Sequence, residues 1–296
     1  MPRLLIVNAD DFGISPGVNR GILEAHRRGI LTSTTAMANM PSFQEAAAIA
    51  RENPSLDVGI HLNLTSGHPV LPPERVLGLL GPEGRFLRAD RLLARLSLGR
   101  LELRQAEAEM NAQVERAMDA GIWPSHLDTH HHLHLHPALQ PMAVRVALRH
   151  GIRGIRTTVE MGRAEMASRA GMLASSAPVG KEKARGVYGK AVILSVLGMS
   201  LRKRARWAGL ATPCRFRGLL LGLAFSGDAL RQTLMELPEG ATELMCHPGY
   251  PDEELARQTS YGPGRDAELR ALLDPAARSV LEEAGVRLGR YSDLPS

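Results

Sequence analysis

Cysteine and aromatic residues are scarce in this chain of 296 residues. The first scarcity bears on the redox environment of the protein and the second on whether it binds nucleic acid. The two cysteines, Cys214 and Cys246, form no Cys-x-x-Cys pair, and this sparse usage favours a reducing, cytoplasmic environment. Aromatic side chains make up only 4% of the residues, which weighs against stacking on nucleic-acid bases. Despite a formal net charge of +5, we therefore expect no nucleic-acid partner.

Long apolar runs are missing as well. The longest, Ala191 to Leu201, is about half as long as a membrane span and includes Ser and Gly, so no transmembrane helix is indicated. At the amino terminus, Met1-Pro2-Arg3 leads directly into an aliphatic run and does not resemble a signal peptide. We therefore expect neither a membrane-spanning nor a secretory segment.

The positive charge is concentrated in one segment. All four lysines lie within residues 181–206, where eight basic residues accompany the single acid Glu182. The segment is also helix-prone and locally apolar, which fits a helix that leans on a membrane surface or on a partner. An ordinary amphipathic surface helix is the alternative interpretation.

The remaining composition, 44% hydrophobic and 23% charged, is that of an ordinary globular protein. Apolar runs that suit buried strands alternate with segments of helical periodicity. We expect strands near 4–7, 31–37, 56–64, 126–134, 154–158, 242–246 and 286–291, and helices near 15–29, 42–52, 103–120, 138–150, 227–237 and 265–285. The alternation predicts an α/β fold, a single irregular TIM-like (β/α) barrel over residues 1–296, with a long active-site loop or insertion at 70–100 and a helical insertion at about 160–225.

Six of the eleven histidines lie within residues 126–136. If this stretch is a strand, its side chains alternate between two faces, and one face carries His126, Asp128, His130, His132 and His134. Neutral imidazole is the commonest metal ligand in proteins, so the stretch indicates metal binding. A solvated loop or a cloning tag is also rich in histidine, but this run is internal and alternates with leucine.

Three other predicted strands also carry polar side chains, at or near their carboxyl ends. Asp10 and Asp11 follow the first strand, His61 lies on the third, and His247 follows the strand at 242–246. Adjacent carboxylates repel, and a metal bound to one of them would relieve the repulsion and leave the other free as a base. Taken singly, the acids could cap a helix and His61 could be a satisfied core residue; the convergence of four strands favours one site.

Five motifs, in this order, resemble the YdjC/ChbG family of carbohydrate deacetylases, relatives of the NodB-type polysaccharide deacetylases. They are Asn-Ala-Asp-Asp-Phe-Gly at 8–13, Thr-Ser-Thr-Thr-Ala at 32–36, Val-Gly-Ile-His-Leu-Asn-Leu-Thr-Ser-Gly at 58–67, His-Leu-Asp-Thr-His-His-His-Leu-His at 126–134, and Cys-His-Pro-Gly at 246–249. The resemblance covers nearly the whole chain. Only 70–100 and 160–225 look individual.

This resemblance implies an irregular (β/α) barrel that hydrolyses the acetamide of an N-acetylated sugar, such as the chitooligosaccharide N,N'-diacetylchitobiose. It implies that Asp11, His61 and His130 bind one divalent cation, Mg²⁺ or Zn²⁺. By the same analogy, Asp10 is the general base and His247 the general acid. His132 is the alternative second histidine ligand, because His132 to Pro137 imitates the His-x-x-x-His-Pro spacing of the NodB relatives.

We also expect His132, Arg156 and Tyr250 to contact the substrate. Several alternatives stay open: a deacetylase of a glycolipid-linked N-acetylglucosamine of the hopanoid type, a sugar-binding relative with a degenerate site, and a metal-dependent phosphoesterase. A phosphoesterase would more often show a second carboxylate-rich metal site, and none follows Asp11 in the sequence. The sequence leaves the sugar, the metal and the assembly, including a homodimer, undecided.

Overall fold

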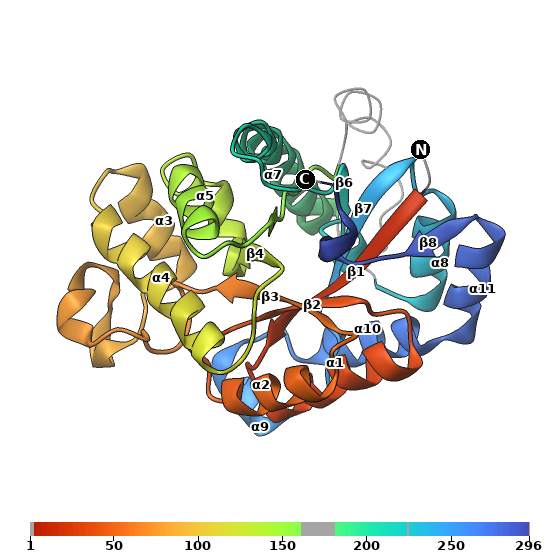
Figure 1. Ribbon diagram of the computed structural model, residues 1–296, viewed down its shortest axis with the longest axis horizontal. Coiled ribbons are helices and arrows are strands. Elements are labelled where there is room, and N and C mark those ends of the chain that lie inside the picture. Colours follow the sequence, from red (N-terminus) through yellow and green to blue (C-terminus); the bar gives the residue numbers. More distant parts are fainter. Residues whose placement is uncertain (1–2, 161–180, 224, 296) are drawn as a thin grey trace.

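The fold is built around the buried strand β1 (Arg3–Phe12). The computed structural model describes residues 3–160, 181–223 and 225–295 (Figure 1). Within these residues the parallel sheet has the order β5-β4-β3-β2-β1-β7-β6, and β8 also pairs with β1. Its strands are β1, β2 (Ser33–Ala36), β3 (Asp57–Leu62), β4 (His126–Thr129), β5 (Gly154–Ile155), β6 (Arg215–Arg217), β7 (Gly240–Cys246) and β8 (Val286–Leu288).

The sheet curls into an irregular barrel with helices on its outside, as the sequence predicts (Figure 1). The edge strands β5 and β6 are connected through the segment that precedes β6. The Ile155 N–H of β5 donates a hydrogen bond to the Ala211 carbonyl of that segment at 3.0 Å. The helices are α1 (Pro16–Arg28), α2 (Phe43–Glu52), α3 (Ala89–Ser97), α4 (Leu103–Asp119), α5 (Gln140–Arg149), α7 (Lys181–Trp207), α8 (Gly227–Met235), α9 (Glu253–Gln258), α10 (Pro263–Leu273) and α11 (Pro275–Glu283).

Local sequence signals account for the first βα unit. Leu4 to Val7 are aliphatic and buried, as suits a strand covered on both faces. Ser15 caps α1 by accepting a hydrogen bond from the Val18 N–H at 3.3 Å, and Pro16 occupies the first helical turn, where its missing N–H costs little. Gly29 ends the helix, as the sequence predicts.

The long loop expected at 70–100 is only partly a loop, because it contains three short 3-10 turns and helix α3. Leu92 and Leu96, one turn apart, are buried and attach α3 to the rest of the protein. Of the expected insertion at 160–225, residues 161–180 lie outside the described ranges. The described part contains α7 and also a strand, β6, that the sequence analysis missed. This strand has only three residues, Arg-Phe-Arg, which are too few to show the alternation of polar and apolar side chains typical of a strand.

The histidine stretch does not continue as a strand, which corrects the alternation predicted for 126–134. β4 ends at Thr129, because His131 and His132 each adopt a positive φ of 58° and start the 3-10 turn His130–Leu135. The chain then folds back, and the His134 N–H donates to the Thr129 hydroxyl at 2.9 Å. His130, His131 and His132 consequently line one cavity, whereas His134 folds back onto Thr129.

Candidate metal and catalytic site

The carboxyl ends of β1, β3, β4 and β7 meet at one cavity of about 470 Å³, a volume typical of small-ligand sites. Asp10 and Asp11 come from β1, His61 from β3, His130 from the residue after β4, and His247 from the residue after β7. All five line the cavity. The convergence expected from the four predicted strands is therefore present in the structure.

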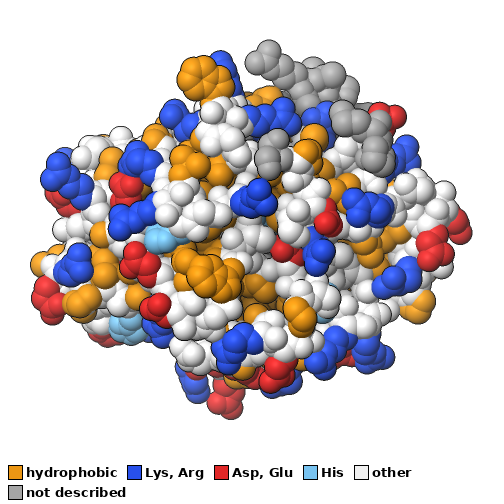
Figure 2. Space-filling view, in the orientation of Figure 1, with side chains coloured by type: hydrophobic (Ala, Val, Ile, Leu, Met, Phe, Trp, Pro, Cys, Tyr) orange, Lys and Arg blue, Asp and Glu red, His pale blue; other side chains and the backbone are white. Residues whose placement is uncertain are grey.

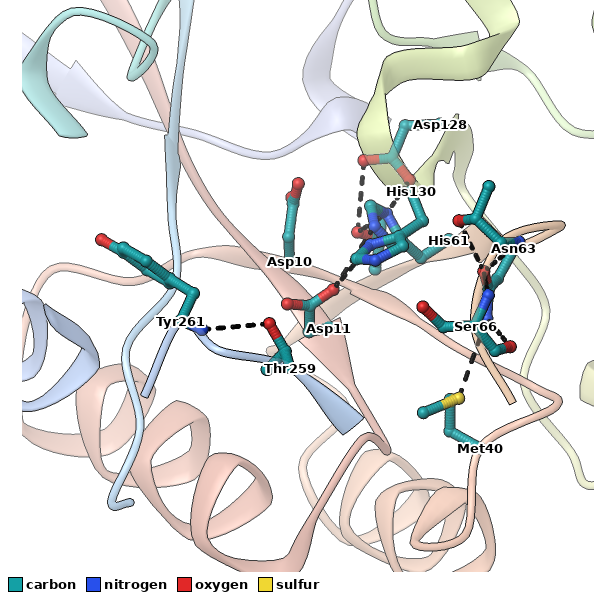
Figure 3. Close-up of polar contacts among 12 residues, drawn as sticks. Asp10, Asp11, Met40, His61, Asn63, Ser66, Asp128, His130, Thr259 and Tyr261 are labelled. Atoms are coloured by element: carbon teal, nitrogen blue, oxygen red, sulfur yellow. Dashed lines mark hydrogen bonds and ion pairs between the residues drawn. The ribbon is translucent and has the colours of Figure 1, made fainter. Parts of the chain in front are cut away.

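Asp11, His61 and His130 form a compact group of possible metal ligands. The Asp11 Oδ1 atom lies 3.5 Å from His61 Nε2 and 3.3 Å from His130 Nδ1 (Figure 3). Oδ1 is buried and has no hydrogen-bond partner among the residues that the structure describes, which is costly for a carboxylate oxygen. One carboxylate and two imidazoles converging on a common point are a donor set that suits Zn²⁺ and other divalent cations.

Asp128 orients His61 from behind. The Nδ1 atom of His61 lies 2.6 Å from Asp128 Oδ1, and Thr35 donates a hydrogen bond to Asp128 Oδ2 at 3.2 Å. With Nδ1 engaged by a carboxylate, Nε2 is the nitrogen left to bind a cation. Burial lowers the pKa of His61, but Asp128 and Asp10 outweigh it and raise the pKa to about 9. Binding of a cation must therefore displace a proton from this imidazole.

Arg156 supplies the counter-charge for Asp10. Its NH1 and NH2 groups donate to the two oxygens of Asp10 at 2.8 and 2.6 Å, and it also pairs with Asp128 and Glu243. Burial tends to raise the pKa of Asp10, yet Arg156 and His61 bring it below its ordinary value, so the carboxyl is ionised. Arg156 itself is fully buried and does not line the cavity. The structure thus places Arg156 behind Asp10, outside the lining of the cavity.

Arg265 plays the same part for Asp11, and the sequence analysis did not identify it. Its NH2 group donates to Asp11 Oδ2 at 2.5 Å, and its side chain is buried. Burial tends to raise the pKa of Asp11, but Arg265 and His130 hold it well below its ordinary value. From the sequence we expected a bound metal to relieve the repulsion between the two aspartates. In the structure two arginines already reduce this repulsion.

His247 follows β7, the strand that pairs with β1, and lines the cavity together with Tyr261 and Glu268. Its backbone N–H donates to Glu268 Oε2 at 2.6 Å, and its Nδ1 atom lies 4.0 Å from Glu268 Oε1. The side chain is 25% exposed, and the ring meets Tyr261 edge to face. His247 is thus held beside a buried carboxylate while its ring stays accessible from the cavity.

Comparison with known proteins places this site in a family. Residues 4–283 match the model of the YdjC-like protein family. The chain belongs to this family. A carbohydrate deacetylase of Geobacillus stearothermophilus is 35% identical over 99% of each chain. A chitooligosaccharide deacetylase of Enterobacter sp. (strain 638) is 34% identical over 99% of this chain and 100% of its own.

A solved structure supports the same grouping. A protein of Enterococcus faecalis V583, to which cellobiose-phosphate cleavage has been ascribed, is 28% identical to this YdjC-like chain. The two structures align with a TM-score of 0.75 over 98% of each chain. The irregular barrel is therefore the fold of both proteins.

Two residues expected to contact the substrate differ in position. His132 lines the cavity of this YdjC-like protein but is outside the Asp11, His61 and His130 group. No residue in the described ranges forms a hydrogen bond with its buried Nδ1 atom. Tyr250 does not line the cavity, because its hydroxyl donates to Glu24 on α1. The expected contact between Tyr250 and substrate is thus not supported by the geometry.

The outer wall of the cavity comes from the individual part of the chain. Val187 and Lys190 of α7 contribute to it, together with Leu219 and Phe225, and Met245 of β7 adds a further apolar side chain. Glu160 fixes the turn that carries Leu219, since its Oε1 accepts hydrogen bonds from the N–H groups of Gly218 and Leu220 at 3.0 and 3.3 Å. Apolar side chains therefore predominate on the side opposite the aspartates.

Proposed function

We propose that this chain is a metal-dependent deacetylase that hydrolyses the acetamide of an N-acetylated carbohydrate, a chitooligosaccharide such as N,N'-diacetylchitobiose. The observation that carries the proposal is the buried Asp11 Oδ1 atom. Within the described part of the chain it lacks a hydrogen-bond partner and faces His61 and His130, with the ionised Asp10 beside it. The names of the relatives from Geobacillus stearothermophilus and Enterobacter support the substrate class.

Asp11, His61 and His130 would hold one divalent cation, for which the donor set allows Zn²⁺ or Mg²⁺. Asp10, Asp11, Asp128 and Glu243 lie near Arg156 and Arg265, so the four carboxylates leave a formal excess of two negative charges over the two guanidiniums. A divalent cation would neutralise this excess. When bound, it would polarise the amide carbonyl and acidify a water molecule.

Asp10 then acts as the general base. Because its pKa is lowered, Asp10 is a weak base and can deprotonate only a water molecule that is itself unusually acidic. A cation held by the neighbouring ligands would supply that acidity. His247, which follows the strand β7 that pairs with β1, also lines the cavity and donates a proton to the departing sugar amine. Acetate and the free amino sugar are the products.

The test is acetate release from N,N'-diacetylchitobiose before chelation, after chelation and after restoring a divalent ion. Loss and recovery of activity support the proposal. Activity that survives complete removal of divalent ions would contradict it. Exchange of Asp10 for Asn separates the alternatives: a pure sugar-binding protein keeps its affinity and never releases acetate, whereas the deacetylase loses turnover but retains binding.

A further inference from the structure

The outer side of α7 carries an apolar stripe that faces solvent. Ile193, Val196 and Trp207 are 61%, 51% and 91% exposed, respectively. Together with Ser200 and Lys203 they follow alternating steps of three and four residues, which places them on one side of the helix. The opposite side is buried and anchors α7 to the barrel; its buried residues include Ala191, Ser195, Leu201 and Ala205.

Basic side chains border this stripe. At 3.6 residues per turn, Lys203 and Arg204 lie on its two flanks, with Lys190 and Arg206 farther around the helix, and all four are exposed. In the orientation of Figure 2, basic and hydrophobic side chains gather along the upper edge, where α7 lies in Figure 1. Aliphatic residues and Trp flanked by Lys and Arg are typical of a helix that lies in the interface of an anionic membrane.

The same helix reaches the catalytic cavity. Val187 and Lys190, near its amino end, line the cavity beside the apolar residues Leu219 and Phe225. The amino end of α7 therefore lies at the cavity, and the exposed stripe continues from there along the rest of the helix. Among the described residues no helix is long and apolar enough to span a bilayer, so such a contact would be peripheral.

We propose that the α7 outer face, defined by Ile193, Val196, Lys203, Arg204 and Trp207, docks on an anionic lipid surface. The charge pattern favours this occupant over a second copy of the chain. In a symmetric dimer the face would meet itself, and the basic residues of both copies would repel each other. Anionic headgroups instead complement the flanks while the apolar stripe enters the interface. This inference goes beyond the proposed deacetylation and does not depend on it.

The two tryptophans of the chain make an internal control. Trp207 lies on the docking face, whereas Trp123 is 75% exposed just before β4, at the opposite end of the strand from the site. In the W123F variant the tryptophan fluorescence comes only from Trp207, and in W207F it comes only from Trp123. With vesicles of 40% phosphatidylglycerol in phosphatidylcholine at low salt, we expect the emission of W123F to shift to the blue and to be quenched by brominated acyl chains, and the emission of W207F to stay unchanged.

Vesicle sedimentation measures the contribution of charge. Each basic side chain near an anionic leaflet strengthens binding about fivefold, so K203Q/R204Q should bind on the order of 30-fold more weakly than the unmodified chain. The matched control R88Q/R91Q removes two exposed arginines near α3 and should bind almost normally. Pure phosphatidylcholine or 0.5 M salt should abolish the difference.

Three results would overturn the proposal. The first is absence of binding to anionic vesicles at low salt, and the second is equal weakening by both pairs of substitutions. The third is a blue shift of Trp207 without vesicles together with a dimer in sedimentation equilibrium, which would assign the face to a second copy. Acetate release from N,N'-diacetylchitobiose without vesicles should be the same in K203Q/R204Q and the unmodified chain, so failure of docking is distinguishable from failure of the catalytic proposal.

Discussion

Replacing Arg156 with Met removes the guanidinium around which three buried carboxylates are arranged. Arg156 pairs with Asp10, Asp128 and Glu243 at 2.6, 2.6 and 2.7 Å, and its side chain is fully buried. Met is unbranched and fills most of the same space, so the loss is mainly one of charge. The three carboxylates would then remain in a region that excludes water, without their shared partner.

The expected cost is large because the pairs are buried. Breaking a buried ion pair from one side costs about 3 to 5 kcal/mol, whereas an exposed pair contributes about 0 to 1 kcal/mol. We therefore expect Arg156→Met to lower the free energy of unfolding at pH 7 by about 3 to 5 kcal/mol. Arg145→Met is the matched control, since Arg145 pairs with Glu107 on the surface at 2.8 Å and should cost about 1 kcal/mol at most.

The pH dependence gives a second check. In the unmodified protein the pKa of Asp10 lies below its ordinary value, so its ion pair stabilises the fold above the unfolded pKa and is lost as pH falls. In the variant, the largest charge that opposes burial is gone and only His61 and His247 still lower the pKa of Asp10, so this pKa rises and the carboxyl takes up a proton more readily as pH falls. The deficit should therefore shrink as pH falls from 7 toward 4.

Urea denaturation followed by circular dichroism, in a chelator so that no bound ion adds stability, measures these differences. A deficit no larger than that of Arg145→Met would refute the buried charge cluster. A deficit that is the same at pH 4 and pH 7 would refute its electrostatic origin.

Three further predictions concern single residues of the site. Asp10→Asn should lower acetate release by about 100- to 10,000-fold, while isothermal titration shows divalent-ion affinity largely retained. Asp128→Asn should weaken ion binding about 10- to 100-fold in the same titration, because His61 loses the carboxylate that orients it; unchanged affinity would exclude that role. Burial raises the pKa of Glu160 from 4.5 to about 7, so the folded state retains a proton and stability should fall, by on the order of 3 kcal/mol, as pH rises through that window. Glu160→Gln should flatten this slope in urea denaturation.

Local patterns predicted most of the elements around the barrel. The aliphatic run before Asp10 and the Ser15-Pro16 start of α1 are short-range signals, and both elements form where expected. The convergence of His61 and His247 on the aspartates follows from parallel topology, because carboxyl ends of neighbouring strands meet at one edge. These parts of the site need no knowledge of distant contacts.

The remainder depends on contacts that no local pattern encodes. Arg156 and Arg265 pair with aspartates 146 and 254 positions away, so the sequence indicates that the acids need counter-charge but not which residues supply it. The strand predicted for 126–134 was wrong beyond Thr129 for a related reason, because the turn there depends on a contact that the alternation pattern does not show. Its alternation with leucine satisfies a strand pattern, yet the left-handed backbone at His131 and His132 is stabilised by the return of His134 to Thr129.

The most direct measurement is a crystal structure of the protein soaked in Zn²⁺, with anomalous diffraction data collected at the zinc edge. The account predicts one strong anomalous peak within about 2.0 to 2.2 Å of Asp11 Oδ1, His61 Nε2 and His130 Nδ1, with Asp10 beside it. No peak among these atoms, or a peak held instead by His132 with the Asp11 group left empty, would contradict it.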